Sequence, residues 1–102
     1  MLTFKLPLSE NSIIVASEAP VSAELAGEAV ILNPDSGMYY GLNEVGARIW
    51  ELIQEPKTVS QIRDAIVAEY EVEPERCESD ILGLLQDLAA KELVEVKDSP
   101  DA

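Results

Sequence analysis

Apolar and polar residues alternate in three short runs between residues 12 and 42, which indicates strands. The runs are Ser12–Ser17, Glu28–Leu32 and Met38–Leu42, each containing β-branched or aromatic residues. Turn-forming residues, Asn33–Gly37 (NPDSG), separate the last two runs, so we expect those two strands to form a hairpin. Pro20 and its polar neighbours predict that Ala19–Gly27 is an irregular connection.

From Asn43 onward the apolar spacing changes to about 3.6 residues, which predicts three helices. Asn43 is a suitable N-cap for the first helix, and Pro56 ends it. Thr58 and Gln61 fit a capping box for the second, and Pro74 suits the first turn of the third. The apolar faces of the three helices are Val45, Ile49, Leu52 and Ile53; then Val59, Ile62, Ile66 and Tyr70; then Cys77, Ile81, Leu84, Leu85 and Leu88. Leu93–Val96 predicts a short closing strand.

The order of elements predicts an α+β fold, with a three-stranded antiparallel sheet followed by three helices (β-β-β-α-α-α). A short turn, Glu71–Glu73, joins the second and third helices, which is typical of a winged helix-turn-helix domain. The 102 residues suffice for one domain, which we place at residues 12–96. Residues 1–11 are expected to be irregular, and the polar residues 97–102 are expected to form a frayed tail.

The charge of the chain disfavours nucleic acid as a partner. The net charge is −13, and residues 1–42 already carry five acidic residues against one lysine. DNA-binding proteins instead need clustered Lys and Arg to neutralise phosphates. The predicted third helix also opens with Pro74–Asp80 (PERCESD), where Arg76 stands among three acidic residues. A winged helix-turn-helix DNA-binding regulator is therefore the weaker alternative, and a basic partner suits the charge better.

No catalytic or metal-binding set of residues emerges. The chain has no histidine, which removes the commonest general base and metal ligand, and it contains no metal-binding motif. We therefore expect no enzymatic activity, no metal and no cofactor. Cys77 lies on an apolar helical face and is expected to be a buried hydrophobic residue. Ser36 follows an aspartate as in acyl carrier proteins, but the β-prone run after Gly37 favours a turn instead of a helix start.

The compartment is predicted from the same features. A single cysteine allows no internal disulfide, which fits a reducing compartment. No apolar run approaches the ~20 residues that span a membrane, and the start of the chain lacks the pattern of a signal peptide. We therefore expect a cytoplasmic protein without a membrane partner.

One segment resembles a known family. Residues 32–52 (LNPDSGMYYGLNEVGARIWEL) contain Leu42-Asn43, then Gly46, then Ile49-Trp50 at fixed spacing, and they closely resemble the pyrroloquinoline-quinone biosynthesis protein D family. The resemblance covers about residues 12–96. It implies a winged helix-turn-helix domain that recognises the leader segment of ribosomally made precursor peptides. In such domains the leader lies as an extra antiparallel strand on the third strand, in a cleft against the third helix.

Within that family the chain is most like the free-standing leader-binding proteins of lasso-peptide biosynthesis, which work with a leader peptidase and a cyclase. The alternative within the family is a chaperone that delivers a precursor peptide to a radical-SAM enzyme. The resemblance thus implies a non-catalytic adaptor, a monomer or a weak dimer, whose partners are a leader peptide and a modifying enzyme.

The expected peptide-binding residues come from the third strand and the third helix. The strand would offer its backbone groups to the leader, and Gly41, which has no Cβ, would allow close approach of another backbone. On the helix we expect Leu84 to contact an apolar leader side chain, and Asp80 and Asp87 to meet basic or hydroxyl groups. The alternative for both aspartates is a solvated surface. The full set is Gly37, Met38, Tyr39, Tyr40, Gly41, Leu42, Asp80, Ile81, Leu84, Leu85, Asp87 and Leu88.

Overall fold

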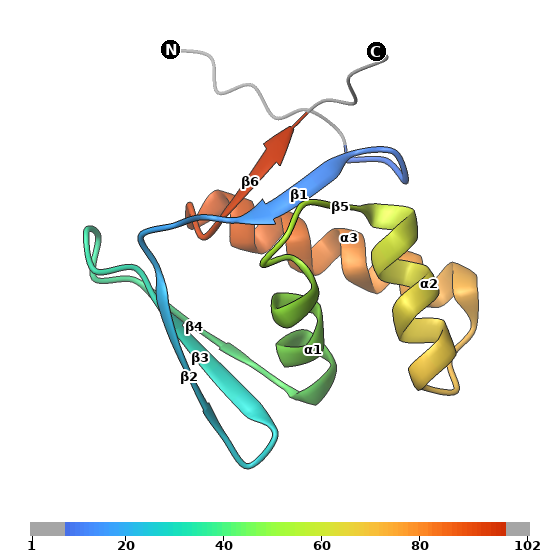
Figure 1. The fold of residues 1–102 in the computed structure, drawn as a ribbon, viewed down its shortest axis with the longest axis horizontal. Coiled ribbons are helices and arrows are strands. Elements are labelled where there is room, and N and C mark those ends of the chain that lie inside the picture. The colour runs from blue at the N-terminus through green and yellow to red at the C-terminus, as the bar shows by residue number, and fades with distance from the viewer. Residues whose placement is uncertain (1–7, 98–102) are drawn as a thin grey trace.

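The computed structural model describes residues 8–97, which form six strands and three helices (Figure 1). In chain order they are β1 (Ile13–Ala16), β2 (Val21–Leu25), β3 (Glu28–Leu32), β4 (Tyr39–Leu42), α1 (Glu44–Leu52), β5 (Lys57–Thr58), α2 (Val59–Glu69), α3 (Pro74–Ala90) and β6 (Val94–Lys97). The predicted α+β class, with antiparallel sheets and three helices, is confirmed.

The strands belong to two sheets, so the expected single sheet of residues 12–17, 28–32 and 38–42 is wrong. One sheet has the order β5-β1-β6 and the other the order β2-β3-β4. The first predicted strand pairs instead with β6, with Ile14 opposite Val96. These partners are far apart in the chain, and alternation along one strand does not specify which distant strand it will pair with.

The region 19–27, expected to be a connection, contains β2. This strand pairs with β3 through a tight turn at Ala26 and Gly27, whose φ angles are 57° and 83°. Pro20 precedes the strand and does not interrupt it, which is a position where proline is tolerated. Proline and polar residues favour a connection locally, but pairing with β3 makes residues 21–25 a strand.

The hairpin of β3 and β4 is confirmed, with Ile31 opposite Tyr40 in the register. Asn33 organises the turn: its backbone N–H donates to the Met38 carbonyl oxygen at 2.8 Å, and its side-chain Oδ1 accepts from the Asp35 N–H at 2.9 Å. Gly37 has a φ of 75°, a conformation that favours glycine. The strand starts at Tyr39, one residue later than predicted.

The helix starts agree with the predicted caps. Asn43 Oδ1 accepts from the Gly46 N–H at 2.9 Å at the start of α1. At α2 the capping box is complete: the Gln61 N–H donates to Thr58 Oγ1, and the Thr58 N–H donates to Gln61 Oε1. Pro74 lies in the first turn of α3.

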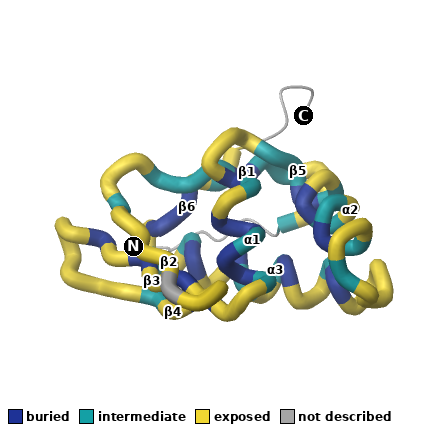
Figure 2. The backbone as a smooth tube through the Cα atoms, turned by 60° about the horizontal axis from the view of Figure 1, so that its bottom comes forward, coloured by how far each residue is buried: buried dark blue, intermediate teal, exposed yellow. Residues whose placement is uncertain are grey.

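The apolar faces of all three helices meet both sheets in one core (Figure 2). Buried residues come from every part of the described chain, including Ile14, Ile31, Ile49, Ile62, Ile81, Leu85, Leu88 and Leu93. Helix α1 packs against β3 on the inner face of the β2-β3-β4 sheet. The outer face of that sheet instead exposes large apolar side chains, from Val21, Val30, Leu32 and Tyr39.

The predicted ends of the chain fall partly outside the described residues. Of the expected irregular segment 1–11, residues 8–11 form no helix or strand, and residues 1–7 lie outside the description. Of the expected tail 97–102, Lys97 belongs to β6 and residues 98–102 lie outside the description. Within residues 8–97, no helix combines the length and apolar character needed to cross a membrane.

Candidate peptide-binding cleft

Strand β4 forms an edge of its sheet. Within residues 8–97 its only paired neighbour is β3. The Asn33 N–H donates to the Met38 carbonyl, and antiparallel strands alternate in the direction of their backbone groups. Tyr40 and Leu42 therefore direct their backbone N–H and C=O groups toward β3, whereas Tyr39 and Gly41 direct theirs away from the sheet. The edge thus offers donors and acceptors to an additional strand.

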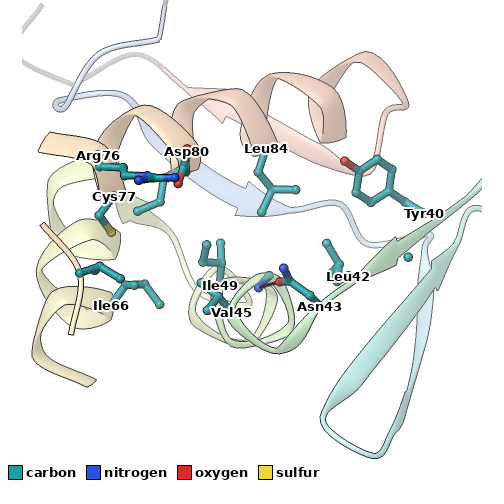
Figure 3. Close-up of a pocket in the computed structure, with 14 residues that line it drawn as sticks. Tyr40, Leu42, Asn43, Val45, Ile49, Ile66, Arg76, Cys77, Asp80 and Leu84 are labelled. Carbon is teal, nitrogen blue, oxygen red and sulfur yellow. Dashed lines mark hydrogen bonds between the residues drawn. The ribbon is translucent and has the colours of Figure 1, made fainter. Parts of the chain in front are cut away.

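A cleft of about 440 Å³ lies between this edge and α3 (Figure 3). Its base is apolar and is made by three helices, with Val45 and Ile49 from α1, Ile66 from α2 and Ile81 from α3. Leu42 and Leu84 form the two sides, from β4 and α3 respectively. An extended peptide at the edge of β4 would therefore place alternate side chains over an apolar surface.

Tyr40 closes the end of the cleft nearest the C-terminal half of α3. Its side chain reaches from β4 to α3, where its hydroxyl donates to Asp87 Oδ2 at 3.3 Å. Lys91 Nζ lies 5.9 Å from the centre of the ring. Burial, followed by the charge of Asp87 and the hydrogen bond to it, raises the pKa of Tyr40 above its ordinary value. The phenol is consequently a neutral donor to the Asp87 carboxylate at neutral pH.

The other end of the cleft carries Arg76, Cys77 and Asp80 from the first turns of α3 (Figure 3). Arg76 and Asp80 are exposed, whereas Cys77 is buried. Burial raises the pKa of the Cys77 thiol, and the nearby Asp80 carboxylate raises it further. The thiol is therefore protonated at neutral pH and acts as a small apolar part of the wall.

The structure brings six of the expected site residues to the cleft, namely Tyr40, Gly41, Leu42, Asp80, Ile81 and Leu84. Asp87 contacts Tyr40 at the closed end. Leu85 and Leu88 are completely buried in the core, beneath the surface that a peptide would touch. Gly37 and Met38 precede β4, and Tyr39 is on the outer face with 70% of its surface exposed.

Gly41 lies on the edge strand, and the close approach of a leader backbone at this position stays a prediction. A Cβ added at this position would meet no atom within 4 Å. The alternation along β4 directs that Cβ toward the outer face of the sheet, away from Tyr40 and Leu42. The fold therefore leaves space for a side chain at position 41.

Eight further residues line the cleft that were not expected to bind peptide: Asn43, Val45, Gly46, Ile49, Ile66, Val72, Arg76 and Cys77. Most belong to α1, α2 or the connection before α3. The helical period had identified Val45, Ile49 and Ile66 as apolar, but it does not show which apolar residues line an opening and which fill the core. Within the described part of the chain, no group of three potential ligand residues is arranged to hold a metal ion.

These observations define a class, a small α+β domain with a free strand edge beside an apolar cleft. The family model described as "Coenzyme PQQ synthesis protein D (PqqD)" matches residues 28–94. The chain belongs to the PqqD family, and the matched residues include β3, β4 and all three helices.

Two solved structures share the fold. One is described as "TbiB1 in Complex with the TbiA(beta) Leader Peptide" and is 46% identical in sequence. The match covers 79% of this chain and 94% of that chain, with a TM-score of 0.73. The other is described as "Lasso peptide synthetase B1 complexed with the leader peptide" and is 24% identical in sequence. The match covers 80% of this chain and 96% of that chain, with a TM-score of 0.70. No curated protein sequence matches the chain.

Proposed function

We propose that this chain is a non-catalytic adaptor that captures the leader of a ribosomally made precursor peptide. The leader joins β4 as an additional antiparallel strand, and the adaptor presents the precursor to a partner leader peptidase or cyclase of a lasso-peptide pathway. The observation that carries the proposal is the free edge of β4 beside the apolar cleft. The similarity to TbiB1, whose structure is a complex with a leader peptide, supports it.

The binding would combine backbone and side-chain contacts. Tyr39 and Gly41 offer their backbone N–H and C=O groups, and each such hydrogen bond contributes about 0.5–1.5 kcal/mol net. Leader side chains that point toward α3 would cover Leu84 and Ile81, and those that point outward would stay in solvent. Backbone pairing supplies affinity for any extended chain, and the cleft supplies selectivity among leaders.

The arrangement around α3 also bears on the fold assignment. Helices α2 and α3 are joined by a short connection, and β6 follows α3 directly. We interpret this unit as the winged helix-turn-helix of the domain, with α3 contacting a peptide at the position where DNA-binding relatives of this architecture contact a groove. The acidic residues Glu75, Glu78 and Asp80 in its first turns suit a peptide better than a phosphate backbone.

A proline substitution at the edge tests strand addition. Proline has no N–H, so Gly41→Pro removes an outward donor of β4 while leaving the inward bonds to β3 in place. We expect the variant to fold, by circular dichroism, and to lose at least about tenfold in affinity for the TbiA(β) leader peptide in a fluorescence titration.

The matched control is Ser22→Pro on the opposite edge of the same sheet. Ser22 pairs with Ile31, whose backbone groups face β4, so the Ser22 N–H points away from the sheet. This variant should bind the leader like the unmodified protein. Tyr39→Ala, which keeps its backbone groups, should cost less affinity than Gly41→Pro. If folded Gly41→Pro bound the leader at full strength, strand addition at β4 would be refuted.

A further inference from the structure

The ring of Tyr40 is held in a defined position at one end of the cleft. Its backbone is paired with Ile31 in the sheet, its hydroxyl is bonded to Asp87 on α3, and the Lys91 ammonium lies near its ring. Contacts on two elements thus restrain a side chain that is only partly buried. A ring restrained in this way acts as a wall, because moving it would break the contact with α3.

Strand addition would bring a leader residue directly against this wall. Tyr39 and Gly41 make the outward hydrogen bonds, so Tyr40 and Leu42 occupy the non-hydrogen-bonded positions of the new pair. In such positions the two Cα atoms are only about 4.5 Å apart, and the side chains share one face of the sheet. The leader residue opposite Tyr40 would therefore project toward its ring.

The next inward position of the leader meets a different environment. It would lie opposite Leu42, beside the deeper part of the cleft, which has Ile49 and Ile66 at its base and Cys77 in its far wall. Among the described residues that line this deeper part of the cleft, none bridges β4 and α3 by a hydrogen bond as Tyr40 does. The leader residue opposite Tyr40 therefore faces the closed end of the cleft. The residue two positions away, opposite Leu42, faces its open apolar volume.

We propose that Tyr40 is a specificity-determining residue that limits the size of the leader side chain directly opposite it. A small side chain fits beside the ring, whereas a large one would displace the ring from Asp87. The position opposite Leu42 accepts large apolar side chains. This inference rests on the proposed function, because it requires the leader to pair with β4.

A tryptophan scan of the leader tests this assignment. Tryptophan is placed at each position of the TbiA(β) leader peptide in turn, and each peptide is titrated against the unmodified protein, Tyr40→Ala and Tyr40→Phe. We expect one position where tryptophan weakens binding to the unmodified protein by about tenfold or more, the size of an overpacking penalty. Tyr40→Ala should reduce that penalty to about threefold or less, since the ring is gone.

The other variants distinguish the effect of the Tyr40 ring on the tryptophan penalty from the effect of its hydrogen bond and from a general effect of mutating the sheet. Tyr40→Phe keeps the ring and should retain most of the penalty, and Val30→Ala, on the outer face of β3, should retain all of it. Tyr40→Val, which places a β-branched side chain suited to a strand at this position, decides the result if Tyr40→Ala is unfolded by circular dichroism.

The outcomes are distinguishable. A tryptophan penalty that is unchanged in the shortened Tyr40 variants, or the absence of any penalty in the unmodified protein, would overturn the role of Tyr40 and leave leader binding intact. Failure of the unsubstituted leader peptide to bind the unmodified protein would instead refute the proposed function itself.

Discussion

Leu84 projects from α3 into the cleft opposite β4 and is only partly buried in the free protein (Figure 3). Leu84→Ala should weaken leader binding by about 1–3 kcal/mol, because the variant removes apolar surface that the leader would cover. Leu82→Ala is the matched control, since Leu82 is also half-buried on α3 but does not line the cleft. Calorimetric titration of both variants with the leader measures the two losses in affinity. If the losses were equal, the effect would come from altered packing of α3 and not from a contact of Leu84 with the leader.

Asp80 is an exposed carboxylate on the same side of the cleft. If the leader places a Lys or Arg there, Asp80→Asn should weaken binding about two- to fivefold and flatten its dependence on salt, as expected for one exposed ion pair. Glu75→Gln, which changes the net charge equally from outside the cleft, should leave both quantities unchanged. If the unmodified protein, Asp80→Asn and Glu75→Gln all showed the same salt dependence, Asp80 would be a solvated surface residue that does not contact the leader.

Between elements, Arg48 joins α1 to α2. Its Nε and Nη2 atoms donate to the two carboxylate oxygens of Glu69, each at 2.8 Å, which is a two-pronged ion pair. The hydrogen bonds from Arg48 lower the pKa of Glu69 below its ordinary value, and burial opposes this only partly. The pair therefore helps to position the α1 part of the cleft relative to α2.

This pair should make stability depend on pH with a defined sign. Because the pKa of Glu69 is lower in the folded state, its contribution is fully present above the ordinary glutamate pKa and disappears as pH falls through the lowered value. Glu69→Gln should therefore be less stable than the unmodified protein near neutral pH, and this gap in the free energy of unfolding should narrow as the pH falls below the ordinary glutamate pKa. Urea unfolding at a series of pH values across this range measures the gap. Glu71→Gln is the control, and a gap independent of pH would contradict the assignment.

At the scale of the whole molecule, leader binding should be linked to folding. The cleft is built from β4 and all three helices, so it exists only when the core is assembled. A ligand that binds only the folded state adds about 2.7 kcal/mol at a free concentration of 100 times its Kd. We expect the TbiA(β) leader to raise the thermal midpoint of the unmodified protein and to raise that of Gly41→Pro by clearly less. A similar rise in both proteins would show that the leader binds elsewhere.

The net charge of −13 also acts at this scale. It generates a field that attracts cationic segments and repels polyanions, and low salt strengthens both effects. The chain is therefore suited to a peptide partner with basic residues, and comparing Asp80→Asn with Glu75→Gln separates this general attraction from a contact in the cleft.

The sequence by itself determined the local features of this protein. Asn43 and Thr58 were identifiable as caps because each bonds to a backbone N–H three residues later. The turn of Asn33–Gly37 and the adjoining hairpin followed from residues that favour such conformations. The helical faces followed from a period of 3.6 residues. All of these depend on interactions between residues close in the chain, and the local sequence specifies them.

Only the tertiary structure decided how those elements are combined. The pairing of β1 with β6 joins segments about 80 residues apart, and the strand alternation of Ile13–Ala16 is compatible with either sheet. Likewise Ile66 and Leu85 both belong to predicted apolar faces, yet the first lines the cleft and the second lies beneath it in the core. The apolar period shows that a side chain is buried when the chain folds. Whether it then meets the core or an opening depends on the neighbouring elements, which long-range packing brings together.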